Sequence, residues 1–236
     1  MATNNAANFP KPIDVPNGGT GASSFTTYAP VCGGTTSTGI LQQAATGIST
    51  SGNVLTSNGA SLLPSWKAQG GPVKIVTLTA SVSSSLTFTS SHITSTYKLY
   101  MIEFTQIKTS AGGQIQIQVS TNGGSSGIGS GYQTCSFKDA YNTATLTRTS
   151  GTAIGVVALL NDSSDTFNGT LYFNAASGVA TQFVGRGSSY STTGTTLRNY
   201  FFGGNNTTTS INGLIFVVSS AGTYTSGTMT LYGISN

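Results

Sequence analysis

The chain has 236 residues, of which only 6% are charged and 37% are hydrophobic. Intrinsic disorder usually combines low hydrophobicity with high net charge, so this composition argues against disorder along the whole chain. Nine basic residues outnumber five acidic ones and give a net charge of +4. The basic residues are scattered and form no run that would follow a phosphate backbone, so we expect no nucleic-acid partner.

The N-terminus shows no secretory signal, because no basic stretch is followed there by an apolar one. The longest apolar runs, residues 154–160 and 213–218, are far too short to span a membrane. We therefore expect assembly in a cytoplasm and no membrane insertion. The two cysteines, Cys32 and Cys135, are too few for a disulfide framework, and we predict that both are free.

Residues 1–72 are rich in Gly, Ser and Thr, and their only charges are Lys11, Asp14 and Lys67. Short apolar clusters recur without sustained periodicity. The LQQAA stretch (41–45) is compatible with one helical turn. NVLTSNGASLLPSW (53–66) predicts two short strands about the SNGAS turn, because Asn-Gly supplies the positive φ angles of a tight hairpin.

Segments this short cannot bury enough apolar surface within one chain. Three copies around a common axis would share one narrow core, and glycine would allow their backbones to approach closely. The composition therefore predicts an extended, trimeric Gly/Ser/Thr-rich stalk. A flexible linker of the same composition is the alternative.

From Val73 onward the sequence is typical of β structure. About ten short segments read as strands, separated by turn-rich stretches and without a convincing helix; they include GQIQIQVST (113–121), which alternates Gln with Ile or Val. We predict strands at 73–82, 85–89, 97–109, 113–121, 143–150, 154–161, 166–176, 181–188, 197–204, 211–220 and 227–235. This pattern indicates an all-β head over residues 73–236, most simply a jelly-roll-like β-sandwich.

Three N-terminal pieces carry a resemblance to a known family: Asn17–Gly21, Tyr28–Thr38 and the Val54–Trp66 segment. Together they resemble the N-terminal repeat-like region of bacteriophage tail-fibre and virion appendage proteins. The ending TMTLYGISN (228–236) is similar to the last strand of small jelly-roll heads on such fibres. The resemblance covers about 50 N-terminal residues well and the head in general character. It implies a homotrimer attached to the virion by its N-terminal end, with a distal β head that touches the host.

The sequence offers little for catalysis or metal binding. The only glutamate, Glu103, lies in a predicted strand, and the lone histidine, His92, lies in a turn. Asp162 and Asp165 share one turn-like loop, and the sequence does not decide whether their carboxylates bind a Ca²⁺ ion. We expect no enzyme activity, no cofactor and no zinc site.

The remaining function is binding to a sugar or another surface. Sites of this kind usually combine exposed aromatic rings with amide, hydroxyl and guanidinium groups. The best candidates lie in the predicted loop around Tyr190 and in the segment LRNYFFGGNN (197–206). The candidate receptor-binding residues are Arg186, Tyr190, Arg198, Asn199 and Tyr200. Tyr132 and Tyr141 are further loop candidates. The competing interpretation is that the aromatic residues fill the core or the trimer seam.

These observations predict a homotrimeric phage virion fibre with a virion-attachment segment (1–20), a stalk (21–72) and a β-sandwich head (73–236). Its head would bind a host-surface glycan or protein, and its N-terminus would bind other virion proteins. The alternative is a structural collar, baseplate or capsid-decoration fibre that contacts no receptor. A depolymerising tailspike enzyme is disfavoured by the scarcity of acids and the lack of a long repetitive β-helix.

Overall fold

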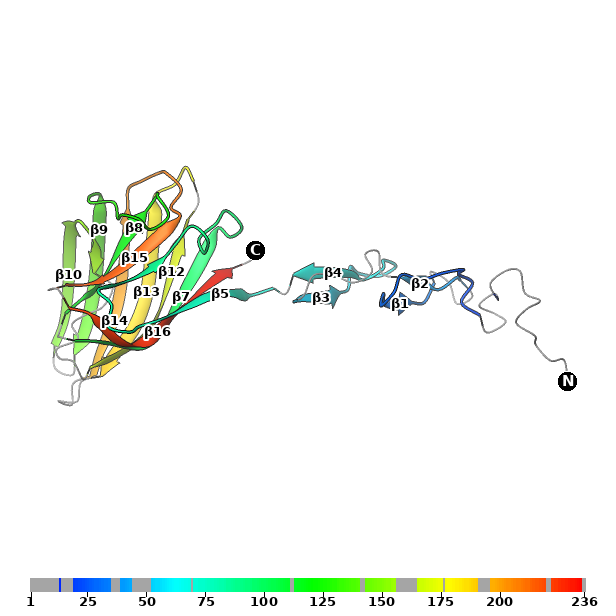
Figure 1. Ribbon diagram of the computed structural model, residues 1–236, viewed down its shortest axis with the longest axis horizontal. Helices are drawn as coiled ribbons and strands as arrows, with labels where there is room; N and C mark the ends of the chain where they lie inside the picture. Colours follow the sequence, from blue (N-terminus) through cyan, green and yellow to red (C-terminus); the bar gives the residue numbers. More distant parts are fainter. Residues whose placement is uncertain are drawn as a thin grey trace. The chain divides into compact units, whose positions relative to one another are not determined.

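The computed structural model divides the chain into two compact units, Met1–Gly70 and Gly71–Asn236 (Figure 1). The change of composition along the sequence predicts this boundary between residues 72 and 73. The structure describes residues 13, 19–34, 39–43, 52–68, 70–110, 113–140, 143–155, 165–175, 177–190, 196–219 and 222–234.

Two short antiparallel hairpins make up the regular structure described in the N-terminal unit. Strand β1 (Val31–Cys32) pairs with β2 (Gln42–Gln43), and β3 (Asn53–Thr56) pairs with β4 (Ser65–Ala68). The predicted 53–66 hairpin is confirmed. A helical turn at 41–45 is wrong for Gln42 and Gln43, because both residues pair in a strand.

A side chain and a glycine close the β3–β4 hairpin. The Asn58 side-chain amide donates to the Leu63 carbonyl oxygen at 2.7 Å and to Ser65 Oγ at 3.0 Å. Gly59 adopts a φ of 102°, in the region that glycine enters without steric cost. The Asn-Gly signal in the sequence thus marks the real turn.

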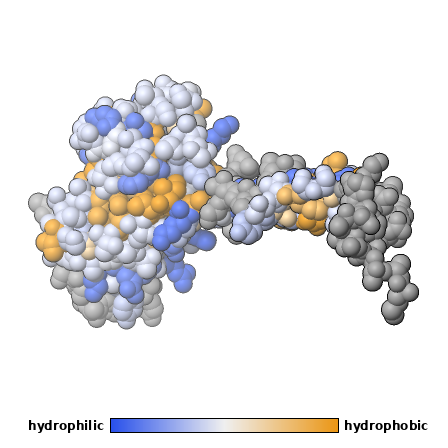
Figure 2. Space-filling view, turned by 45° about the vertical axis from the view of Figure 1, so that its right-hand side comes forward, coloured by the Kyte–Doolittle hydropathy of each residue, from blue (hydrophilic) through white to orange (hydrophobic). Residues whose placement is uncertain are grey.

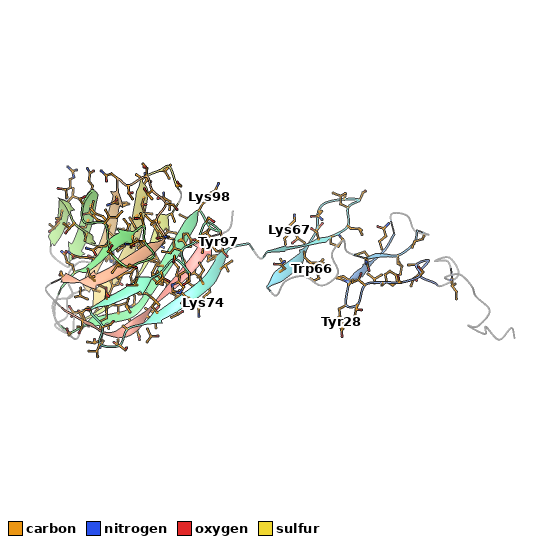
Figure 3. All side chains as sticks on the ribbon, turned by 45° about the horizontal axis from the view of Figure 1, so that its top comes forward. Tyr28, Trp66, Lys67, Lys74, Tyr97 and Lys98 are labelled. Carbon is orange, nitrogen blue, oxygen red and sulfur yellow. The ribbon has the colours of Figure 1, made fainter. Side chains whose placement is uncertain are left out.

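None of the described residues of the N-terminal unit is buried. Seven of its large apolar side chains are exposed: Ile13, Tyr28, Val31, Ile40, Val54, Leu55 and Leu62. Tyr28 is 84% exposed, and Figure 3 shows its side chain pointing away from the neighbouring strands. The described part of this unit therefore has no hydrophobic core within one chain.

The C-terminal unit is an all-β structure of two antiparallel sheets. Its strands are β5 (Pro72–Thr79), β6 (Ser85–Phe88), β7 (Leu99–Thr109), β8 (Ile115–Ser120), β9 (Tyr132–Ala140), β10 (Thr143–Gly151), β11 (Ile154–Gly155), β12 (Thr166–Asn174), β13 (Thr181–Tyr190), β14 (Thr196–Asn205), β15 (Gly213–Val218) and β16 (Tyr224–Ile234). The larger sheet has the order β10-β9-β14-β13-β12-β7-β16-β5, and the smaller has the order β11-β8-β15-β6. Figure 1 shows β8 and β15 lying over the larger sheet.

Eight of these strands pair in a nested series. The first pairs with the last, β5 with β16, and moving inward β6 pairs with β15, β7 with β12 and β8 with β11. The members of each pair lie in the same sheet, and successive pairs alternate between the two sheets. The other four strands, β9, β10, β13 and β14, extend the larger sheet beyond β12.

The hydrophobic core lies between the two sheets and follows from the alternation of side chains along each strand. In β8, Ile115, Ile117 and Val119 are fully buried, whereas the glutamines between them are half-buried. The rings of Phe104 on β7 and Phe216 on β15 meet edge to face across the sheets, with centroids 5.6 Å apart. The β-sandwich character predicted for the head is confirmed.

The positions of most strands also agree with the sequence analysis. The exception is β9, which falls where no strand is predicted. Its sequence, YQTCSFKDA, lacks an apolar alternation. The segment is nevertheless a strand because its backbone pairs along its whole length with β14 on one side and β10 on the other.

Glycines on the inner face of β13 make room for aromatic rings. A methyl group added at Gly185 would overlap the ring of Phe201 on β14, and one added at Gly187 would overlap the ring of Phe167 on β12. Both rings are buried. The rings therefore cover the bare backbone of β13 and hold this part of the sheet against the core.

We predict that Gly185→Ala destabilises the C-terminal unit by about 1–3 kcal/mol, because overpacking forces buried groups apart. Gly151→Ala on β10 is the matched control, since a methyl group there meets no atom within 4 Å. Urea unfolding followed by circular dichroism measures both variants. Equal stability of Gly185→Ala and the wild type would refute this packing.

Burial raises the pKa of Tyr224, whose hydroxyl has no hydrogen-bond partner in the structure described. Burial also raises the pKa of Tyr132, and its hydroxyl accepts a 2.8 Å hydrogen bond from the backbone N–H of Val119. A raised pKa in the folded state stabilises the fold fully below the unfolded-state pKa of about 10. This stabilisation is lost as the pH rises further.

We therefore predict that the wild-type free energy of unfolding falls above about pH 10, by up to about 1.4 kcal/mol per pH unit for each of Tyr132 and Tyr224. Tyr224→Phe should remove the contribution of Tyr224 to the fall of the unfolding free energy with pH. It should cost no stability at pH 7, because it deletes a buried hydroxyl that lacks a partner. Urea titrations from pH 7 to 11.5 test this, and an unchanged alkaline slope would contradict it.

Candidate functional site

The outer face of the larger sheet, which points away from the smaller sheet, gathers most of the predicted binding residues. Side chains directly opposite each other in register share a face. Arg186 on β13 lies opposite Tyr200 on β14 and Thr170 on β12, and Tyr200 lies opposite Phe137 on β9. The register therefore brings a guanidinium and two aromatic rings from three strands into one row.

Three of the predicted residues, Arg186, Arg198 and Tyr200, line one surface hollow of about 470 Å³. The remaining lining comes from Glu103, Phe104, Thr105, Asn168, Gly169, Thr170, Gly187 and Ser188. Tyr190 ends β13 on the same face and is 58% exposed, but it does not line this hollow. Tyr190 is the last residue of β13, so its prediction as a loop residue is wrong, whereas Arg186, Arg198 and Tyr200 lie within the strands predicted at 181–188 and 197–204.

The structure does not bring Asn199 to this face. Its neighbours Arg198 and Tyr200 point outward, so alternation turns Asn199 inward, where its side chain is only 4% exposed. Of the two additional candidates, Tyr132 is also buried, and Tyr141 lies outside the described residues. Asn199 and Tyr132 therefore cannot touch a ligand on the outer face.

A β-bulge shapes the rim of the hollow on the β7 side. Gln106 has a φ of 50°, unusual for a residue other than glycine, and the β7–β12 register shifts beside it. The backbone N–H of Gln106 donates to Asn168 Oδ1 at 2.9 Å, which gives the displaced amide a partner. Asn168 is thereby fixed at the edge of the hollow.

One carboxylate lines the hollow, and it already has a hydrogen-bond donor. The hydroxyl of Tyr232 on β16 donates to Glu103 Oε2 at 3.1 Å. Partial burial, with a further contribution from this carboxylate, raises the pKa of Tyr232. The side chain of Glu103 is thus held toward β16, away from the guanidinium groups on β13 and β14.

A larger trough of about 920 Å³ opens over the strands that extend the sheet, and the sequence analysis missed it. Its lining residues are Gly131, Gln133, Thr134, Cys135, Arg148, Ser150, Ala180, Thr181, Gln182, Phe183, Val184, Phe202, Gly203, Gly204, Asn205 and Asn206. Gln133 and Gln182 both lie opposite Gly204, which leaves bare backbone between them. Period-two alternation in LRNYFFGG predicts that Phe202 points to the same face as Tyr200. The rest of the trough depends on the pairing of β9 with β14, which are far apart in the sequence, so no local pattern predicts it.

Large apolar side chains are exposed along this face instead of being covered. They are Phe137, Leu146, Tyr172, Val184, Tyr190, Tyr200 and Phe202, of which Phe202 is 52% exposed. The Phe137 and Tyr200 rings lie 6.3 Å apart with a tilt of 46°. Figure 2 views the C-terminal unit from another side and shows that hydrophobic residues reach the surface there too, with hydrophilic surface around them. Contiguous exposed apolar side chains typically mark a surface that binds something.

The other residues considered for chemistry do not join this site. Asp165 is buried, Asp162 lies outside the described residues, and His92 accepts a hydrogen bond from the Thr89 backbone in a turn. Among the residues that the structure describes, no group of three His, Cys, Asp or Glu could hold a metal ion. Cys32 and Cys135 are both free.

Among the residues that the structure describes, no helix has the length and apolar character needed to cross a membrane.

The groups gathered on the outer face are guanidinium, phenol, amide and hydroxyl groups beside exposed rings. Such groups recognise a ligand by hydrogen bonding, ion pairing and stacking. Comparison of the chain with known protein families, with curated proteins and with solved structures finds no match.

Proposed function

We propose that this protein is a homotrimeric phage virion fibre that attaches to the host surface through the outer face of its C-terminal β unit. One observation carries the proposal, namely the contrast between the two units. The C-terminal unit has a full core and an uncovered binding face, whereas the described part of the N-terminal unit buries no residue. The tail-fibre resemblance of residues 17–66 agrees with this division of labour.

The N-terminal unit supports the trimer because its hairpins are too small to be stable alone. A two-stranded hairpin is marginal in water unless its apolar face is covered. Val54, Leu55 and Leu62 lie exposed in or beside the β3–β4 hairpin. Sister chains would cover these side chains and form the shared core of a stalk. A linker would leave them exposed, and the ordered pairing of β3 with β4 favours the stalk.

The nested strand pairing supports a jelly roll for the C-terminal unit. A jelly roll arises when a long antiparallel hairpin folds over, so that its successive strand pairs alternate between two sheets. The series β5–β16, β6–β15, β7–β12 and β8–β11 has this form. The β9–β10 and β13–β14 segments are then insertions, and they carry most of the binding face. Insertions into a stable scaffold are a common place for binding residues.

Attachment would follow from several weak contacts made at once. A trimer presents three copies of the outer face, and linked sites raise the overall affinity by orders of magnitude. With only 6% charged residues, this binding would depend less on salt than that of a strongly charged protein. Other virion proteins would hold the N-terminal segment.

The proposal is tested by the retention of fluorescently labelled full chain on a panel of bacterial strains. We predict that the wild type is retained on its host, and that Arg186→Ala and Tyr200→Ala each lower retention about tenfold or more, because central aromatic and arginine contacts dominate binding energy. Lys74→Ala, which removes an exposed cation near the other edge of the same sheet, should have little effect.

Two results would contradict attachment through this outer face. Retention that survives both substitutions would show that another surface binds the cell. A labelled chain that binds purified virion particles but no cell in the panel would favour a structural appendage instead.

A further inference from the structure

Three arginines point to the same face from three different strands. Arg148 on β10 lines the trough, and Arg186 on β13 and Arg198 on β14 line the hollow. Among the side chains that the structure describes, which do not include that of Asp139, none is recorded in an ion pair with these three guanidinium groups. Glu103 is the one carboxylate in either lining, and it accepts a hydrogen bond from Tyr232. Asp139 occupies the register position opposite Arg198. Three arginines against these two acidic residues leave a net charge of +1, so the face suits an anionic ligand.

The same face offers flat apolar platforms beside amide groups. Phe202 and Val184 lie opposite each other in the trough, flanked by the amide-bearing Gln133 and Gln182. Aromatic rings have a negative face and attract the slightly positive C–H groups of a sugar ring. Amide groups both donate and accept hydrogen bonds, as sugar hydroxyls require. Stacking beside paired amides suits a carbohydrate better than a simple anion.

The size of the face requires a ligand longer than one sugar. From Gln182 in the trough to Arg186 in the hollow, four residues along β13 cover about 13 Å at about 3.3 Å per residue. From Arg148 to Arg186, three strand spacings cover about 14 Å at about 4.8 Å each. The rows that contain Val184 and Arg186 are adjacent on the face, so one chain molecule can contact both openings.

Other occupants fit these observations less well. A second copy of this chain, docked symmetrically through this face, would set arginines against arginines, and like charges opposed across an interface cost affinity. A nucleic acid would be bound mainly through many phosphate contacts, whereas this face supplies three cations.

We propose that the trough and the hollow form one binding face for an acidic oligosaccharide, with carboxylates at Arg148, Arg186 and Arg198 and sugar rings stacked on Phe202 and Tyr200. Guanidinium groups bind carboxylates with two parallel hydrogen bonds, which gives both strength and orientation. This assignment deepens the proposed function and rests on it, since it names the class of host molecule that the head contacts.

The test uses the full chain and three hexasaccharides as probes, built from galacturonate, from hyaluronan and from sialic acid. Each has a matched control in which the carboxylates are reduced to alcohols. We expect at least one acidic hexasaccharide to bind about tenfold or more tightly than its reduced counterpart by titration calorimetry. A thymidine oligonucleotide of similar length serves as a further comparison.

Variants then locate the binding. Arg148→Ala and Phe202→Ala should each weaken binding of the acidic probe about tenfold or more. Both residues are exposed on the outer face, so neither change removes core packing. Arg148→Lys should bind between Arg148→Ala and the wild type, because lysine keeps the charge but loses the bidentate geometry. Lys74→Ala should match the wild type.

The outcomes separate this assignment from the proposed function. A chain that is retained on cells but binds no acidic probe, or binds the reduced probes equally well, overturns the acidic oligosaccharide and leaves host attachment standing. Tighter binding of the oligonucleotide also overturns it. A chain that binds an acidic probe through Arg148 but is retained on no cell supports the oligosaccharide site and contradicts host attachment.

Discussion

The alternation of side chains along a β-strand is the constraint on which the C-terminal unit depends. Each strand of the larger sheet must serve two environments, because successive residues point to opposite faces. On β13, Phe183 points to the core, whereas Val184 and Arg186 point outward. The inward-facing residues of each strand pack in the core and stabilise the fold. The outward-facing residues are not needed for that packing and can contact a ligand. A single strand can therefore hold the fold together and display a binding group.

This separation explains how the proposed binding face can be polar, aromatic and cationic without loss of stability. The nested pairs from β5–β16 to β8–β11 enclose the core, and the four additional strands continue the larger sheet outward. The proposed binding groups then lie on paired backbone and not on loops. Groups held on strands keep a more precise geometry than groups on loops, which suits recognition by several directional hydrogen bonds.

Local patterns in the sequence predict much of this fold. Alternation in IQIQVS marks β8, and the Asn-Gly pair marks the β3–β4 hairpin. The same alternation in LRNYFFGG places Arg198 and Tyr200 on one face and could have excluded Asn199. It does not identify β9, because the inward positions of that strand include Thr134 and Ser136, which give no apolar signal. The strand forms through its partners.

The trough could not be predicted because its residues meet only through pairings between distant segments. Gln133 and Gln182 come from strands separated by β14, and the bare position between them is Gly204. Each of these residues has an ordinary turn or strand composition around it. Their common face depends on the register of β9 with β14 and of β14 with β13, which no local pattern encodes.

The N-terminal unit differs from the C-terminal unit, because none of its described residues is buried within one chain. The proposed stalk therefore needs sister chains to cover Val54, Leu55 and Leu62. Light scattering of the full chain measures this most directly. The account predicts a mass of about 72 kDa, three times the 24.0 kDa of one chain, at all concentrations down to the micromolar range. A mass of 24.0 kDa in solution would contradict the shared stalk.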